Sequence, residues 1–138
     1  ATYFWKLPTY RSWLSANRRM PLIVLDRDGV INEDSDAYIR SLADWRPIPG
    51  SIAAIAALSQ AGFTIAVATN QSGLSRGYLS LDDLEAIHHT MCQRVEAAGG
   101  QIAGIFYCPH LPEACHGPAA GHRDRGGRVA EGGNLYWR

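Results

Sequence analysis

The sequence predicts an α/β fold, a doubly wound, Rossmann-like three-layer sandwich around a parallel sheet. Short apolar runs alternate along the chain with amphipathic segments, and glycines follow the amphipathic segments. This alternation gives the order strand, helix, strand, helix, strand. Because crossovers between neighbouring parallel strands are right-handed, such an order folds into a parallel sheet with helices packed on it.

The first half of the predicted fold begins with the apolar run at 22–25, which is typical of a central strand covered on both faces. Residues 30–48 are polar and irregular and indicate a loop or small hairpin. A helix is expected at 51–61, with Gly62 in the position that glycine favours after a helix. The β-branched run at 63–69 predicts the second strand.

The second half begins with Ser80 and Asp83, which resemble a capping box and predict a helix that ends near Gly99. The apolar face of this helix is expected to be Leu84, Ile87, Met91 and Val95. Cys92 is expected in the core, and His88 and His89 are expected to be surface or packing residues. The third strand is predicted at 102–107.

Three regions are predicted from the change in composition along the chain. Residues 1–19 are aromatic and basic without periodicity, and indicate an irregular extension. Residues 20–115 carry the predicted core. Residues 116–138 are rich in glycine and arginine and indicate an irregular tail.

Composition excludes several classes of function. The chain has 138 residues, room for one domain, and its 13 basic and 13 acidic residues give a formal net charge of zero. No global field therefore attracts nucleic acid or an anionic membrane, and no apolar run approaches the roughly 20 residues that span a bilayer. With 3 cysteines and no signal-like segment, a reducing, cytoplasmic location is expected. A monomer is also expected.

The most informative polar segment is Asp26-Arg27-Asp28-Gly29, directly after the first predicted strand. Ligands of open parallel sheets bind at the carboxyl ends of the strands. Two carboxylates this close repel each other and favour a nearby cation, and Mg²⁺ suits them. One acid could attack phosphorus while the other moves a proton. The alternative is an Asp-rich turn that caps the next element.

The next two strands are also followed by polar residues. Thr69 offers a hydroxyl, and the loop at 70–73 can present backbone N–H groups to an anion, although an ordinary strand-to-helix connection would look similar. Cys108-Pro109-His110 follows the third strand. All three segments can therefore converge on one crevice.

Three strings in this order, LDRDGVIN, TNQSGLSRG and FYCPHLPE, resemble the haloacid dehalogenase-like (HAD) phosphohydrolases. In detail they resemble the branch of D-glycero-D-manno-heptose-1,7-bisphosphate 7-phosphatases, with histidinol-phosphate phosphatases as close relatives. The likeness covers about residues 20–115. It implies a Mg²⁺-dependent phosphoric monoester hydrolase acting on a small phosphorylated sugar. Heptose 1,7-bisphosphate is the expected substrate, and histidinol phosphate is the alternative.

The resemblance also implies residue roles. Asp26 would be the nucleophile and a Mg²⁺ ligand. Asp28 would exchange a proton with the sugar oxygen and with water, and would bind the metal through its backbone carbonyl. Thr69 and Asn70 would hold the phosphoryl group. The remaining substrate contacts implied are Arg76 and Asn32, the latter near the sugar.

Zinc is a second metal that the resemblance raises. Members of the family carry a C-x-H…C-x-C loop that holds structural Zn²⁺. Cys108, His110 and Cys115 match its first three ligands, but His116 follows where x-Cys is expected. Two interpretations stay open: a zinc site completed by His116, and free thiols with solvated imidazoles.

The C-terminal motifs of the family are not matched, so its C-terminal strands are expected to be missing or altered. The pattern calls for a lysine and for a strand ending in Gly-Asp. Lys6 is the only lysine, and after Cys115 the only acids are Asp124 and Glu131. A hypothesis of a different class follows, in which the chain is a catalytically inactive remnant of a truncated or frame-shifted gene.

Overall fold

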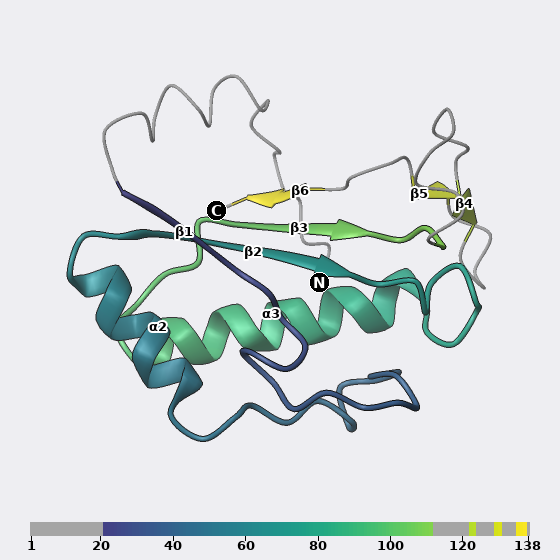
Figure 1. Cartoon of the computed structure of the whole chain (residues 1–138), viewed down its shortest axis with the longest axis horizontal. Coiled ribbons are helices and arrows are strands. Elements are labelled where there is room, and N and C mark those ends of the chain that lie inside the picture. Colours follow the sequence, from purple (N-terminus) through teal and green to yellow (C-terminus); the bar gives the residue numbers. More distant parts are fainter. Residues whose placement is uncertain (1–20, 112–121, 124–128, 131–134, 138) are drawn as a thin grey trace.

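The fold is a sheet with helices packed against it (Figure 1). The computed structural model describes residues 21–111, 122–123, 129–130 and 135–137. The strands of the main sheet are β1 Leu22–Leu25, β2 Thr64–Asn70, β3 Gly104–Cys108 and β6 Leu135–Trp137. The helices are α2 Ser51–Gln60 and α3 Leu81–Ala97, and a separate pair of strands is β4 His122–Arg123 and β5 Val129–Ala130.

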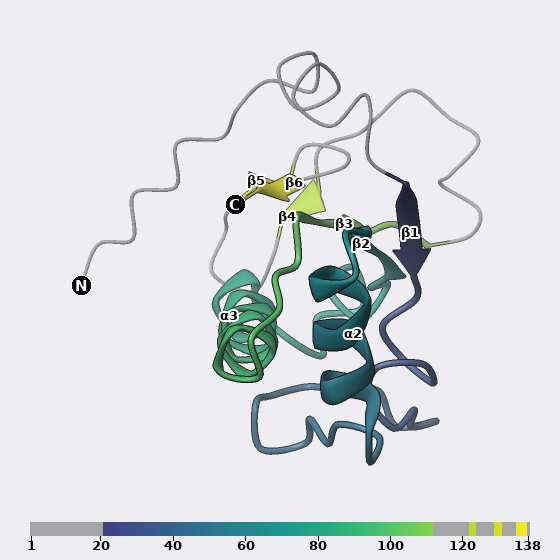
Figure 2. The ribbon, with the colours of Figure 1, turned by 90° about the vertical axis from the view of Figure 1, so that its left-hand side faces the viewer.

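The predicted order of strands and helices is confirmed over β1 to β3. β2 pairs in parallel with β1 on one side and with β3 on the other. α2 and α3 both cover the same face of the sheet (Figure 2). All three carboxyl ends therefore lie at one edge of the sheet. Of the three layers predicted, the described residues form the sheet and one helical layer.

The core lies between the sheet and the two helices. The face predicted for α3 is confirmed, because Leu84, Ile87, Met91 and Val95 all have 0% exposure. Ile55 of α2 and Ile65 and Val67 of β2 belong to the same buried cluster. The loop at 30–48 has no regular element, but its apolar side chains also enter the core. They are Ile31, Ile39 and Trp45.

Local signals set the ends of the helices. Ser80 and Asp83 form the predicted capping box: Ser80 Oγ accepts from the Asp83 backbone N–H at 3.1 Å, and Asp83 Oδ2 accepts from the Ser80 backbone N–H at 2.9 Å. Gly62 and Gly99 follow the two helices with positive φ values of 95° and 90°. α3 thus begins and ends where its sequence indicates.

The prediction that 22–25 is a central strand covered on both faces is wrong. β1 lies at the end of the strand order, and Leu22 and Val24 are 49% and 57% exposed. Ile23 and Leu25 pack against the core instead. The cause is that the described helices cover one face only and that no other described strand pairs with the outer edge of β1.

Part of the predicted irregular tail forms strands. β6 pairs antiparallel with β3, with Ile105 opposite Tyr136, so the sheet is not purely parallel. The run Leu135-Tyr136-Trp137 has the aromatic and apolar character that favours strands, and β3 offers it an edge. The predicted extension at 1–19 lies outside the described residues. None of the helices in the described ranges is long and apolar enough to cross a bilayer.

Candidate active site

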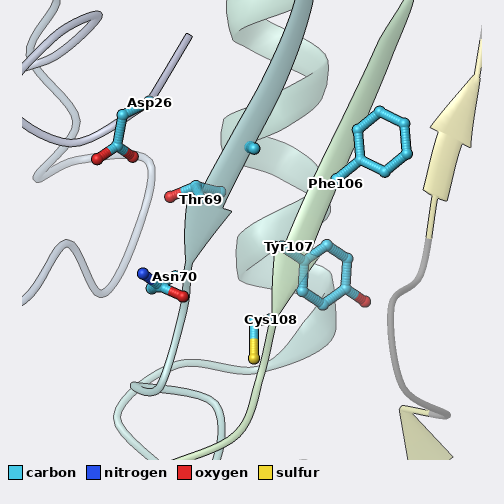
Figure 3. A pocket seen from close by; sticks show the side chains of 7 residues that line it. Asp26, Thr69, Asn70, Phe106, Tyr107 and Cys108 are labelled. Carbon is cyan, nitrogen blue, oxygen red and sulfur yellow. The ribbon is translucent and has the colours of Figure 1, made fainter. Parts of the chain in front are cut away.

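The ends of β1, β2 and β3 surround one cavity of about 400 Å³ (Figure 3). Asp26 comes from the end of β1, Thr69 and Asn70 from the end of β2, and Cys108 from the end of β3. The side of the cavity formed by β3 adds Phe106 and Tyr107, and Ala68 completes the lining. A cavity of this size accommodates a small ligand.

Asp26 is exposed at this cavity. Its Oδ1 accepts a hydrogen bond from the Arg27 backbone N–H at 2.7 Å. This contact holds one oxygen of the carboxylate close to the main chain. In Figure 3 the Thr69 hydroxyl points to the side of β2 on which the Asp26 carboxylate lies. An acid in this setting is accessible to a ligand.

Asp28 has very different surroundings, although it is only two residues further on. Its Oδ1 accepts from Arg27 Nε at 2.8 Å and from Asn32 Nδ2 at 3.0 Å, and lies 2.8 Å from Arg27 Nη2 in an ion pair. Its Oδ2 accepts from Gln71 Nε2 at 3.0 Å. The sequence predicted a cation beside the two acids, and Arg27 is such a cation for Asp28.

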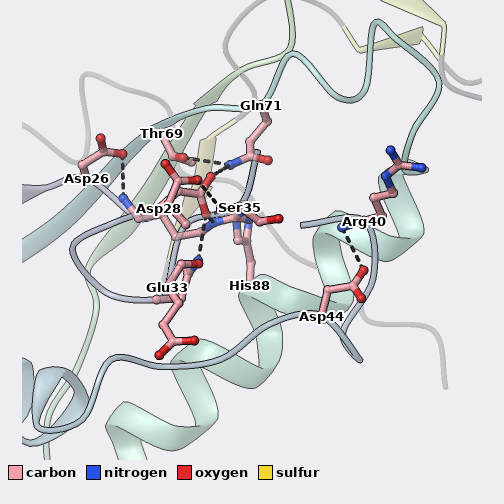
Figure 4. Close-up of polar contacts among 12 residues, drawn as sticks. Asp26, Asp28, Glu33, Ser35, Arg40, Asp44, Thr69, Gln71 and His88 are labelled. Carbon is pink, nitrogen blue, oxygen red and sulfur yellow. Dashed lines mark hydrogen bonds and ion pairs between the residues drawn. The ribbon is translucent and has the colours of Figure 1, made fainter. Parts of the chain in front are cut away.

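Gln71 joins the ends of two strands, a role that was not predicted. Its side-chain amide donates to Asp28 Oδ2 and also to Thr69 Oγ1 at 2.9 Å (Figure 4). The side chain is buried, and the Gln71 backbone N–H donates to the Cys108 carbonyl at 2.8 Å. The acid after β1 and the hydroxyl of β2 are therefore held together by one amide group.

Arg27 and His88 form a buried pair behind Asp28. Arg27 has 0% exposure, and its Nη1 lies 3.2 Å from His88 Nε2 of α3. Burial lowers the pKa of Arg27, while the carboxylate of Asp28 opposes this shift. Burial and the charge of Arg27 hold the pKa of His88 well below its usual 6.5. His88 is therefore a buried neutral acceptor rather than a surface residue.

Two residues expected to contact substrate are not among those that line this cavity. Asn32 has 0% exposure, and its amide donates to Asp28 and to the Glu33 carbonyl. It is thus a partner of Asp28, and its expected place near the sugar stays a prediction. Arg76 is exposed on the loop after β2, outside the set of residues that line the cavity.

The expected zinc ligands are only partly described. Cys108 lines the cavity and His110 is half-buried beyond it. Cys115 and His116 lie outside the described residues. Within the described ranges no group of three or more His, Cys, Asp or Glu side chains is arranged to hold a metal ion. Zinc binding therefore stays a prediction.

The donors at the cavity fit Mg²⁺, which is commonly held by one or two carboxylates together with waters and phosphate oxygens. The exposed carboxylate of Asp26 offers such a donor. The Asp28 side chain suits a metal less well, because Oδ1 accepts from Arg27 and Asn32 and Oδ2 accepts from Gln71. The resemblance implies the backbone carbonyl of Asp28 as the metal ligand instead.

A first strand followed by Asp-Arg-Asp-Gly, a second that ends in Thr-Asn and a shared cavity define a haloacid dehalogenase-like fold and site. No family model matches the chain. Individual curated proteins do match, and both of the following are named D-glycero-beta-D-manno-heptose-1,7-bisphosphate 7-phosphatase. The Pseudomonas putida protein is 56% identical over 105 residues, which are 74% of this chain and 60% of the relative. The Pseudomonas aeruginosa protein is 60% identical over 92 residues, 67% of this chain and 52% of the relative.

Solved structures agree with these matches. The D,D-heptose 1,7-bisphosphate phosphatase of Bordetella bronchiseptica, complexed with magnesium and phosphate, superposes with a TM-score of 0.67 at 50% identity, covering 69% of this chain and 53% of that chain. The Burkholderia thailandensis enzyme gives a TM-score of 0.51 at 44% identity, covering 63% of this chain and 51% of that chain. The matched part of this chain is similar to the heptose-bisphosphate phosphatases of the HAD superfamily. It spans about half to three fifths of the length of these relatives.

Proposed function

We propose that the protein is a Mg²⁺-dependent phosphatase that hydrolyses D-glycero-D-manno-heptose 1,7-bisphosphate at the 7-phosphate. The observation that carries this proposal is the unequal pair of acids. Asp26 is open to the cavity, whereas Asp28 is held by Arg27, Asn32 and Gln71. Two carboxylates in such different environments suit two different roles, a nucleophile and a proton carrier.

The chemistry divides between these acids. An Asp26 oxygen attacks phosphorus, and the bond between phosphorus and the sugar oxygen breaks with its electron pair on oxygen. Asp28 donates a proton to that oxygen. Water then attacks the aspartyl-phosphate, gives its proton to Asp28 and releases phosphate, which restores both acids. Thr69 and Asn70 hold the phosphoryl oxygens, and bound Mg²⁺ supplies positive charge that neutralises them.

The choice of substrate is supported by the relatives. The names of the P. putida and P. aeruginosa proteins and the names of two superposed structures specify the heptose bisphosphate. The cavity has room for one small phosphorylated molecule. Nothing in these comparisons favours histidinol phosphate, which therefore serves as the comparison substrate.

The test is phosphate release by the full chain with Mg²⁺, using heptose 1,7-bisphosphate and histidinol phosphate at equal concentration. We expect faster release from the heptose bisphosphate, no release with EDTA, and no release by Asp26→Asn. The matched control is Asp36→Asn, which removes an exposed carboxylate from the following loop. A chain that binds Mg²⁺ but releases no phosphate from either substrate would support the inactive remnant, and unchanged release by Asp26→Asn would exclude Asp26 as nucleophile.

A further inference from the structure

We propose that Arg27 and His88 are positioning residues that orient the Asp28 carboxylate so that only its Oδ2 carries the transferred proton. This inference rests on the proposed function and deepens it. It assigns the proton to one oxygen of the acid and gives a role to a histidine of α3. The argument starts from the donors that surround each oxygen of Asp28.

The Oδ1 atom of Asp28 has no room for a proton. A carboxylate oxygen has two lone-pair positions, and Arg27 Nε at 2.8 Å and Asn32 Nδ2 at 3.0 Å point hydrogens at both. Arg27 Nη2, also 2.8 Å away, adds its charge. A proton on Oδ1 would displace one of these donors. Among the residues that the structure describes, one such donor approaches the Oδ2 atom, Gln71 Nε2 at 3.0 Å, which leaves its second position open to them.

This arrangement requires that the guanidinium of Arg27 keep its orientation. Two of its nitrogens face Asp28, and the third, Nη1, lies 3.2 Å from His88 Nε2. A guanidinium has only donors, so Nε2 must be the acceptor and the ring proton must sit on Nδ1. Both side chains are buried, at 0% and 3% exposure. His88 therefore anchors Arg27 from the side opposite Asp28.

His88 itself is packed into the core. The neighbouring α3 residues Ile87 and Met91 are fully buried, and the ring of Tyr107 from β3 lies 6.2 Å from that of His88. A fixed chain of contacts thus runs from the core helix through Arg27 to the acid. Without an acceptor at His88, the buried Nη1 loses a partner and the guanidinium rotates to find another. Asp28 then loses the alignment that its proton transfer needs.

The first test does not depend on turnover. In the ¹⁵N-labelled full chain, NMR should show His88 as a neutral ring protonated on Nδ1 between pH 6 and 8, and a slowly exchanging Nε–H signal for Arg27. His89→Gln, a change at the neighbouring half-buried histidine, assigns the signals and should leave both unchanged. A His88 ring protonated on Nε2, or on both nitrogens at pH 7, would overturn the proposal.

The second test compares two replacements of His88. The side-chain oxygen of glutamine can take the place of Nε2 as acceptor, whereas leucine fills similar space without one. We expect His88→Leu to lower kcat by about 10- to 100-fold, the scale of a misplacement near 1 Å, while KM changes less than about twofold. His88→Gln should recover most of kcat and also the Arg27 Nε–H signal.

The two variants and the NMR signals distinguish a failure of the positioning role from a failure of the proposed function. Equal kcat values for His88→Leu and His88→Gln, whether both lowered or both normal, would contradict the positioning role. If the unchanged chain has no turnover, the proposed function fails, and the Arg27 Nε–H signal decides this inference by itself. It should be lost in His88→Leu and kept in His88→Gln. If His88→Leu does not fold, kcat and the signal in His88→Gln still decide.

Discussion

The buried ring of His88 links pH to stability at the scale of one residue. Its pKa in the folded chain is held well below 6.5 by burial and by Arg27, the charged group that faces it, while the Tyr107 ring packs nearby. Below pH 6.5 the unfolded chain therefore binds a proton at this position that the folded chain does not. The stabilisation is complete above pH 6.5 and is lost as pH falls toward the folded pKa.

We expect this histidine to contribute a loss of up to about 1.4 kcal/mol per pH unit below pH 6.5 to the free energy of unfolding. Urea unfolding at a series of pH values measures it. His88→Gln should give a flatter curve between pH 6.5 and 5, because that side chain cannot titrate. Parallel curves for the two proteins would show that His88 does not remain neutral in the folded chain.

Gln71 is the residue whose loss should affect the acid and the phosphate together. Gln71→Met removes the donor to Asp28 Oδ2 and the donor to Thr69 Oγ1. We expect kcat to fall on the order of 10- to 100-fold, and inhibition by inorganic phosphate to weaken. Gln60→Met is the matched control, because Gln60 donates to the Gly99 carbonyl in an exposed position. A fall in kcat with unchanged phosphate inhibition would argue against the bridge to Thr69.

Which of these residues the sequence could predict depends on how local their contacts are. Asp26 and Thr69 were predicted because a polar residue directly after a buried strand is visible in the sequence. Arg27 and His88 are 61 residues apart, and their contact exists only once α3 packs against the sheet. The alternation of apolar residues on α3 shows that position 88 lies near the buried face, but not that a guanidinium meets it there.

At the scale of the elements, the capping box of α3 is a local feature with a measurable effect. Ser80→Ala removes the acceptor for the Asp83 backbone N–H, and we expect a loss of about 1 kcal/mol in the free energy of unfolding. Ser35→Ala is the control, because Ser35 Oγ accepts only an exposed turn contact at 3.2 Å from Ala37. Thermal unfolding compares the two, and equal losses would contradict the capping role.

The sequence predicts where the helices begin and end better than it predicts which faces and edges of a strand are covered. The helices begin and end close to the predicted residues because caps and glycines act within a few positions. The exposure of Val24 in β1 depends on which strands and helices lie beside it. The sequence does not show this, because a run of four apolar residues can form either a central strand or an edge strand. β6 was missed for a similar reason, since its pairing depends on the edge of β3.

At the scale of the whole molecule, the sheet should not be equally stable throughout. β2 lies between two partners and is buried along most of its length, whereas β1 has one partner and two exposed apolar side chains. We expect the amides of β2 to exchange with deuterium much more slowly than those of β1. Hydrogen-exchange mass spectrometry measures this difference, and equal protection would show that β1 is covered in solution.

Hydrogen bonds connect the three segments that follow the strands around the cavity. The Gln71 amide joins the second to Asp28 in the first, the Gln71 backbone N–H joins it to Cys108 in the third, and the Ser75 hydroxyl donates to the Pro109 carbonyl. The opening of the site is therefore held by contacts among all three segments. A ligand wider than the opening would have to break these contacts to enter, so we expect the opening to limit the width of the substrates that the site admits.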